Sequence, residues 1–251
     1  MSDWLSYRPS DFLMFAPRTY WRLFELHNGA WWPAQPLAVL AGLGWIGLLR
    51  RKGSPALRAG AAGLAAAWLF VAFAFTLERY AAVNWAASGF AVSFVLQSLL
   101  LTALATRVDS RVVSPGPRRH IGLAICAWAL MGHPLLAMAF GRPWTQAEVF
   151  GLAPDPTAIA TLGVLLCTAG QQPATAWLLR GLWILTVAWC VVSSATLWTL
   201  GSAQAWVLMG AMLVSLVAAW RWPRDAAKSR DPPVSATVAG ASASANIQEP
   251  P

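Results

Sequence analysis

Charged residues are scarce in this sequence. They make up 11% of its 251 residues and hydrophobic residues 57%, whereas an average soluble domain carries roughly 25% charged residues. The charge is also unbalanced, with 18 Lys and Arg against 10 Asp and Glu. These basic residues flank apolar runs, a placement that membrane orientation explains better than nucleic-acid binding does. We therefore predict a membrane protein with no nucleic-acid partner.

Cysteines are few and catalytic motifs are absent. Cys126, Cys167 and Cys190 lie inside apolar runs and form no CxxC pair, so neither a disulfide framework nor a zinc site is predicted. The sequence contains no HExxH, GxSxG or Walker A motif. His27 and His133 have the right residue type for haem, but nothing in their spacing supports it. No cofactor is predicted, and an enzyme is less expected than a non-enzyme.

Apolar runs, in contrast, are long. One extends from Ala59 to Ala105, a length of 47 residues, which is about twice what one membrane-spanning helix needs. Its polar break is ERYAAVNW, which begins at Glu78 and Arg79. We predict that this break is the crest of a helical hairpin. The first apolar run of the chain, residues 12–15, is too short for the core of a signal peptide.

We predict an all-α bundle of about seven transmembrane helices, which form one domain over residues 31–220. The fifth is short, because the 13 residues from Thr157 to Ala169 give about 20 Å of helix against a hydrocarbon core of about 30 Å. It is either a short span or a re-entrant half-helix. The predicted spans are residues 31–49, 59–77, 81–105, 121–140, 156–170, 181–200 and 203–220.

Two further regions flank this domain. Residues 1–30 are too polar to span and rich in aromatic residues, and their polar side chains after Pro17 fall on one helical face. We predict an interfacial helix lying on the bilayer, with a lid over a substrate path as the alternative. Residues 221–251 are rich in Ala, Ser, Pro and charge, which predicts a disordered tail. The candidate anchor residues of the interfacial helix are Arg18, Tyr20, Trp21, Arg22 and Glu25.

Two of the predicted spans carry stripes of small or polar residues. In the second span, Ala59, Gly63 and Ala67 recur every four residues, which is typical of close helix contact. In the third span, mostly small and polar residues from Asn84 to Thr102 recur at steps of four and three. Polar groups are costly in hydrocarbon, so this seam is predicted to face other helices or to line a polar path.

The distribution of basic residues predicts the orientation. With seven spans and an outer amino terminus, 13 basic residues lie on the cytoplasmic side and five lie outside. A re-entrant fifth segment would change this split to 8 inside and 10 outside. Because cytoplasmic loops carry an excess of Lys and Arg, the first arrangement is favoured. We therefore predict that the fifth segment crosses and that the carboxyl terminus is cytoplasmic.

Three stretches are long and specific enough to compare with known families. They are DFLMFAPRTYWRLFELHN at 11–28, ERYAAVNWAA at 78–87 and GRPWTQAEVFGLAPDPTAIATLG at 141–163. They resemble an uncharacterised family of bacterial membrane proteins, a domain of unknown function, over about residues 4 to 221. The resemblance implies a multi-pass protein of the bacterial cytoplasmic (inner) membrane. Members of that family are sometimes labelled permease-like, and the resemblance assigns no active residues.

All three stretches fall on the outer side of the predicted bundle, where their polar residues form a candidate site. Charged residues at membrane depth usually face a partner or an aqueous cavity. Because the hairpin crest and the outer half of the fourth span lie at similar depth, we expect Asn84 and His133 to converge with the crest. The full candidate set is Glu78, Arg79, Asn84, His133, Arg142, Glu148 and Asp155.

Structural roles compete with this interpretation. Glu78 and Arg79 fit the solvated crest of a hairpin, and Asp155 fits the cap at the start of a helix. Arg142 and Glu148 fit a pair across a loop, which contributes little when it is exposed.

Three functions remain open on this basis. A small permease or solute-binding membrane protein is favoured by the polar seam and the short fifth segment, because transporters often use short or broken helices near their sites. A subunit or scaffold of a membrane complex would use the polar crest to dock a partner. A membrane enzyme or cofactor binder would use Glu78, His133 and Asp155. The expected partners are the lipid bilayer and either a small solute or another membrane protein.

Overall fold

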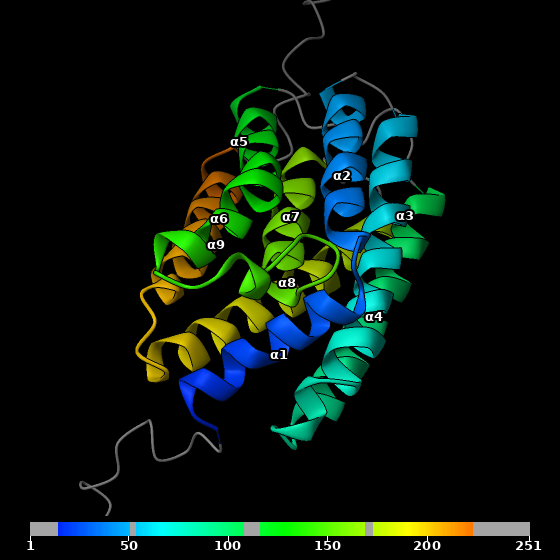
Figure 1. The fold of residues 1–251 in the computed structure, drawn as a ribbon. Coiled ribbons are helices and arrows are strands. Elements are labelled where there is room, and N and C mark those ends of the chain that lie inside the picture. Colours follow the sequence, from blue (N-terminus) through cyan, green and yellow to red (C-terminus); the bar gives the residue numbers. More distant parts are fainter. Residues whose placement is uncertain (1–14, 51–53, 108–115, 169–172, 223–251) are drawn as a thin grey trace, which may run out of the picture.

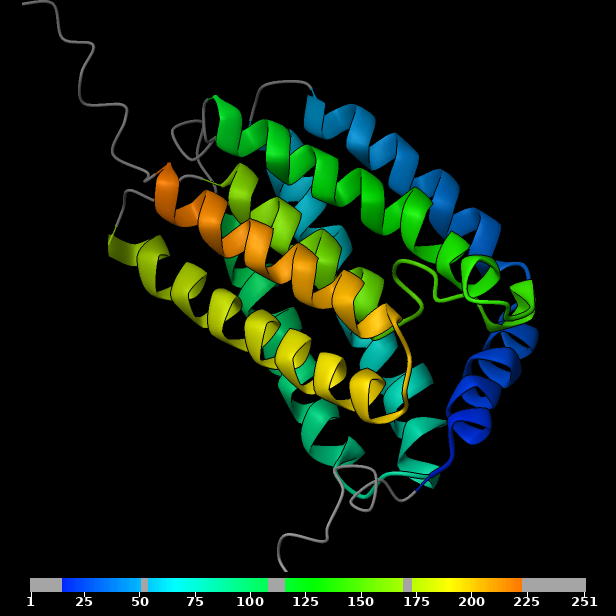
Figure 2. The same cartoon turned by 90° about the vertical axis from the view of Figure 1, so that its left-hand side faces the viewer.

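One short helix lies at the centre of the fold. The computed structural model describes residues 15–50, 54–107, 116–168 and 173–222, which form helices joined by turns. All 14 residues of helix α7, Pro154–Cys167, are buried. Helices from both halves of the chain pack around it, namely α3, α5, α8 and α9 (Figures 1 and 2).

The chain forms this bundle with short connections between long helices. Helix α3 continues directly into the π-helical segment η3, and α5 continues through the π-helical segment η6 into α6. In chain order the elements are α1 (Pro17–Ala30), α2 (Ala34–Arg50), α3 (Ser54–Phe70), η3 (Val71–Leu77), η4 (Tyr80–Ala82), α4 (Ala87–Arg107), α5 (Pro117–Ala127), η6 (Trp128–Gly132), α6 (His133–Ala139), η7 (Trp144–Gln146), α7, α8 (Pro173–Thr199) and α9 (Gln204–Arg221).

Several of these helices are long and apolar enough to cross a membrane. In the described part of the chain they are Pro55–Ala82, Ala87–Arg107, Pro117–Ala139, Thr175–Thr199 and Gln204–Arg221. Helices α1 and α2 pass the same test only as a pair bent by 85°, which brings the number to five or six. Helix α7 is apolar but shorter. The all-α architecture is confirmed for the described residues, and the seventh span stays a prediction.

A pair of glycines lets α5 and α7 cross at close range. A Cβ atom built on Gly122 would lie 2.5 Å from the carbonyl oxygen of Gly163, and one built on Gly163 would lie 2.6 Å from the carbonyl oxygen of Gly122. Both separations are too short for real Cβ atoms. Small residues at a helix crossing allow the two backbones to approach. This crossing lets neighbouring helices enclose α7.

Two arginines at the start of α5 tie helix ends together. Arg118 donates to the carbonyl oxygens of Leu165 at 3.4 Å and Trp222 at 3.5 Å. Arg119 donates to the carbonyl oxygen of Leu49 at 2.6 Å. These oxygens lie at the carboxyl-terminal ends of α7, α9 and α2, where unpaired carbonyl groups and the helix dipole favour a cation. The basic end of the bundle is therefore held by direct contacts to the backbone.

Helix α1 lies across the opposite end of the bundle (Figures 1 and 2). Its buried face consists of Tyr20, Leu23, Phe24 and His27. Phe24 stacks on Phe75 of η3 with ring centroids 4.7 Å apart. Packing against the bundle therefore holds α1 in place, above the polar side chains described next.

Candidate functional site

Five charged and polar side chains meet inside the bundle beneath α1. They come from α6, α7, α9 and the loop between α6 and α7, and we call them the charged cluster. Four of them are at most 2% exposed, and Arg142 is half-buried. Buried charges at membrane depth are costly and usually functional. The members of the charged cluster are His133, Arg142, Glu148, Asp155 and Gln204.

Proline sets the position of His133 in this cluster. Pro134 has no N–H, so it cannot donate to the carbonyl group of Leu130 one turn earlier. The helix widens into the π-helical segment η6 just before this point and resumes as α6 at His133. Single π-helical turns of this kind occur frequently at functional sites. The histidine side chain faces inward and is 1% exposed.

The carboxylate of Glu148 links the other polar side chains of the charged cluster. Its Oε2 atom lies 3.3 Å from Nε2 of His133 and also accepts from the amide nitrogen of Gln204. The amide oxygen of Gln204 in turn accepts from the guanidinium group of Arg142. Gln204 therefore bridges the carboxylate and the cation. The expected association of Arg142 with Glu148 takes this indirect form.

Asp155 lies in the first turn of α7 and is fully buried. Its carboxylate accepts from the indole N–H of Trp189 at 2.9 Å and from the hydroxyl group of Ser193 at 2.7 Å. It also interacts electrostatically with Glu148 and His133. The expectation that Asp155 caps the helix is wrong, because Ala153 occupies the cap position without a side-chain hydrogen bond. The two bonds to α8 hold this carboxylate inside the bundle.

Arg142 joins the cluster to α1. Its guanidinium carbon lies 3.5 Å from the centre of the Trp21 ring, a cation–π contact. Burial lowers the pKa of the Arg142 guanidinium, and the Glu148 carboxylate acts in the opposite direction. Arginine starts from so high a pKa that it stays charged. Arg142 is thus the permanent cation of the cluster.

The charges of the cluster do not balance when both of its carboxylates are ionised. Ionised Glu148 and Asp155 would carry two negative charges, and Arg142 supplies one positive charge. Buried charges need partners, so one proton held within the cluster or a cationic ligand would complete the balance. Three buried atoms in this group, Oε1 of Glu148, Nδ1 of His133 and Nε of Arg142, have no hydrogen-bond partner among the described residues. Across the same residues, no three His, Cys, Asp or Glu side chains are grouped to hold a metal ion.

A pocket of about 410 Å³ lies next to the cluster, under the bend between α1 and α2. Gln35 lines it, and the buried Oε1 atom of Gln35 has no partner among the described residues. Ala147 and Val149 form the inner wall. The backbone at residue 147 is extended, and successive side chains of an extended chain point to opposite sides. Glu148 therefore lies on the far side of a wall that is one residue thick.

Three residues of the expected outer site lie at the hairpin crest instead of in the cluster. Glu78 is exposed, and Asn84 accepts a hydrogen bond from the backbone N–H of Ala86 at 2.9 Å. Arg79 is half-buried and acts electrostatically on His27 of α1. No hydrogen bond or ion pair found among the described residues joins these three to His133. The expected set thus divides into a crest group and the charged cluster.

The anchor residues expected on α1 also divide between its two faces. Tyr20 is buried against the bundle and Trp21 covers Arg142. Arg18 is exposed, and Arg22 pairs with Glu25 on the outer side of α1. One face therefore packs on protein while the other carries charge outward, and placement of α1 on a bilayer stays a prediction.

Three partners of the carboxylates were not predicted from the sequence. Gln204 begins α9, and Trp189 and Ser193 lie within α8, in segments that the sequence presents as plain apolar spans. The one available signal is that Gln204 is a polar residue at the amino-terminal end of a span, on the same outer side as the Gly141–Thr157 stretch in the predicted topology. That signal is too weak to identify a partner.

We expect Trp21→Leu to lower stability by about 1–2 kcal/mol, because a partly desolvated cation–π contact contributes about that much. The midpoint of thermal unfolding of the purified protein in detergent measures this. Trp85→Leu is the matched control, since Trp85 is 81% exposed. Equal shifts for the two variants would show that the Arg142 stack contributes nothing.

Comparison with known proteins gives one family. A profile described as "Family of unknown function (DUF6064)" matches residues 18–230. The matched range includes all of the charged cluster and nearly all of α1. No curated protein and no solved structure matches the chain significantly.

Proposed function

The chain belongs to the DUF6064 family of unknown function, and from that premise we propose that it is a multi-pass membrane protein that acts as a small permease. Its solute would be small and polar and would bind in the pocket under the α1–α2 bend. The charged cluster behind that pocket would exchange a proton during the cycle. The observation that carries the proposal is the cluster itself: two carboxylates, a histidine and an arginine gathered inside a bundle of helices apolar enough to cross a membrane.

The outer faces of the helices support placement in a bilayer. Large apolar side chains are exposed on them, among them Val92 at 70%, Leu99 at 61% and Ile184 at 66%. Helix α7 has no such face, because neighbouring helices enclose it. Its short length therefore creates no mismatch with lipid. On this basis we propose that α7 is a seventh crossing.

The ends of the bundle support the orientation proposed for it. Arg50, Arg107, Arg118 and Arg221 all lie at or near helix termini at the end away from α1. Cytoplasmic loops are enriched in basic residues. We therefore assign that end to the cytoplasm and the α1 end, with its pocket, to the outside.

The position of Glu148 suggests how solute and proton would be coupled. Oε1 of Gln35, an acceptor without a partner in the described part of the chain, favours a solute with an N–H or O–H donor. A solute in the pocket would rest on the 147–149 wall, and a small displacement of that wall would move Glu148 relative to His133. That displacement would break the contacts of Glu148 Oε2 with His133 and Gln204, and a buried carboxylate without those donors needs another partner.

Glu148→Gln is expected to abolish solute-driven proton movement while leaving the fold intact. Glutamine keeps an acceptor for His133 and Gln204, and its NH₂ group would occupy the site of Oε1, which has no partner among the residues that the structure describes. The measurement uses liposomes that contain the purified protein and an internal pH-sensitive dye. Small amines, amino acids and carboxylates are added one class at a time.

Glu78→Gln is the matched control for this experiment, since Glu78 is exposed at the hairpin crest, outside both the solute pocket and the charged cluster. Its proton signal should remain. A wild-type signal equal to that of empty liposomes for every class of solute would reject the permease proposal, provided that the protein elutes as a single folded species.

A further inference from the structure

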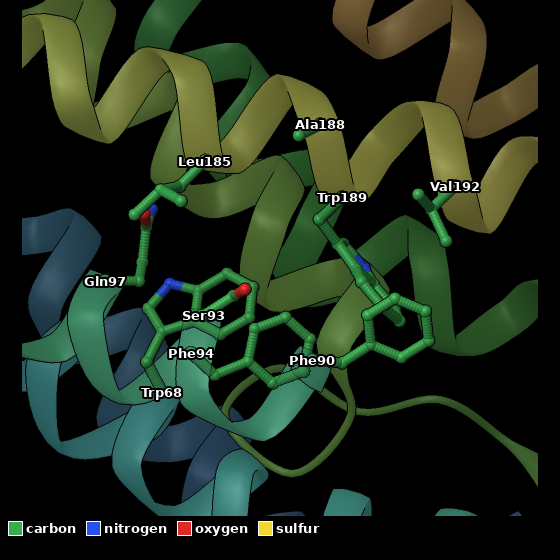
Figure 3. A pocket seen from close by; sticks show the side chains of 9 residues that line it. All are labelled: Trp68, Phe90, Ser93, Phe94, Gln97, Leu185, Ala188, Trp189 and Val192. Atoms are coloured by element: carbon green, nitrogen blue, oxygen red, sulfur yellow. The ribbon is translucent and has the colours of Figure 1, made fainter. Parts of the chain in front are cut away.

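A second pocket opens on the side of the bundle, away from the charged cluster. It has a volume of about 150 Å³ and lies between α3, α4 and α8. Figure 3 shows aromatic rings on several sides of it, and the rings of Phe94 and Trp189 meet edge to face with centroids 4.8 Å apart. Val192 and Ala188 line its outer edge and are exposed. In a bilayer this edge would face hydrocarbon.

One polar group in the lining, the side-chain amide of Gln97, has an acceptor atom that lacks a hydrogen-bond donor in the part of the chain that the structure describes. Gln97 is 1% exposed, and its amide nitrogen donates to Oγ1 of Thr186 at 2.6 Å. Thr186 uses its single hydroxyl proton to donate to the carbonyl oxygen of Leu182 at 2.7 Å. Oγ1 of Thr186 can therefore only accept, which fixes the orientation of the Gln97 amide. The atom left without a partner among the described residues is the acceptor Oε1 of Gln97.

We propose that this pocket binds a single-ring aromatic molecule that carries an O–H or N–H donor, of the phenol class. A cavity of roughly 150 Å³ lined by apolar side chains accommodates benzene. Edge-to-face and stacked contacts with the aromatic walls suit a flat ring. A buried acceptor without a partner is costly, so a ligand that donates to Oε1 of Gln97 gains over one that cannot. The ligand would enter from the bilayer past Ala188.

The pocket could bind such a ring whether or not the protein transports a solute. The pocket adjoins the charged cluster through Trp189, which forms a wall of the pocket and also donates to Asp155. A ring bound in the pocket would therefore touch the residue that holds one of the buried carboxylates.

Two probes that differ by one hydroxyl group test the proposal. The ¹⁹F NMR signals of 4-fluorophenol and fluorobenzene are followed as wild-type protein in detergent is added, with empty micelles as the baseline. We expect both to bind, with 4-fluorophenol about tenfold tighter, the factor for roughly 1.4 kcal/mol from one hydrogen bond to an otherwise unpaired acceptor.

Two variants separate the donor requirement from the pocket itself. Gln97→Met removes the acceptor at similar side-chain length, and it should reduce the affinity for 4-fluorophenol to that for fluorobenzene. Ala188→Trp should block the outer edge without disturbing the core, since Ala188 is exposed, and it should abolish both signals. The proposal would be overturned if wild-type protein bound the two probes with equal affinity, or if it broadened their ¹⁹F signals no more than empty micelles do. It would also be overturned if the preference for 4-fluorophenol over fluorobenzene survived either substitution.

Discussion

Gly163→Ala will destabilise the protein by about 3 kcal/mol, near the upper end of the usual range for overpacking a core. The added methyl group would lie 2.5 Å from Sγ of Cys126 and 2.6 Å from the carbonyl oxygen of Gly122. The second of these atoms belongs to a helix backbone and cannot rotate away. Relief therefore requires α5 and α7 to separate, which opens the packing around the central helix. The midpoint of thermal unfolding and the yield of monodisperse protein measure the effect.

Gly63→Ala is the matched control, and its effect should be absent or of opposite sign. A Cβ at Gly63 has nothing within 4 Å. Alanine is also the better helix former, by up to about 1 kcal/mol in a helix interior. If both substitutions shift the midpoint alike, the α5–α7 crossing is not what makes glycine necessary at position 163.

These two glycines show where the sequence misled the packing prediction. The repeat of Ala59, Gly63 and Ala67 predicted the close contact, yet Ala59 and Gly63 are exposed. The close contact lies between Gly122 and Gly163, each a single glycine on its own helix. A spacing rule detects repeats within one helix and cannot pair lone residues on different helices, because their pairing depends on the tertiary arrangement.

In the third predicted span, too, the residue pattern predicted the buried face only in part. Ser98 is buried and donates to the carbonyl oxygen of Ala65 at 2.7 Å, as the predicted seam implies. Ser88 and Thr102 belong to that seam but are exposed. Thr102 satisfies its hydroxyl group within its own helix by donating to the carbonyl oxygen of Ser98. A polar residue in a span therefore does not by itself identify the buried face.

Local chemistry explains what could be predicted. Apolar run length indicated the helices, and the short fifth segment and the Pro134 irregularity were visible in the sequence. His133, Arg142, Glu148 and Asp155 were all expected in one polar region. These four residues group apart from Glu78, and Gln204 bridges two of them. Both facts depend on how α6, α7 and α9 are rotated about their own axes. That rotation is set by packing throughout the bundle, which no local pattern records.

Arg142→Leu will lower stability by about 3 kcal/mol. Leaving a buried charge without its compensating charge costs roughly 3–5 kcal/mol. The lower end applies because Arg142 is half-buried and reaches Glu148 only through Gln204. The variant leaves Glu148 and Asp155 buried without the permanent cation of the cluster. It also removes the stack on Trp21, which loosens α1. Thermal unfolding gives the global effect, and hydrogen exchange of residues 17–30 gives the effect on α1.

Arg22→Leu provides the comparison, because it removes the same charge from an exposed pair. Arg22 contacts Glu25 at the surface of α1, and exposed pairs contribute about 0–1 kcal/mol. The double variant Arg142→Leu with Glu148→Gln should recover part of the loss, since it removes one negative charge along with the positive one. A double variant less stable than Arg142→Leu alone would mean that hydrogen bonds, and not charge balance, hold the cluster together. Recovery would instead show that loss of the cation is better tolerated when the carboxylate charge at Glu148 is lost with it, so that charge balance helps to hold the cluster together.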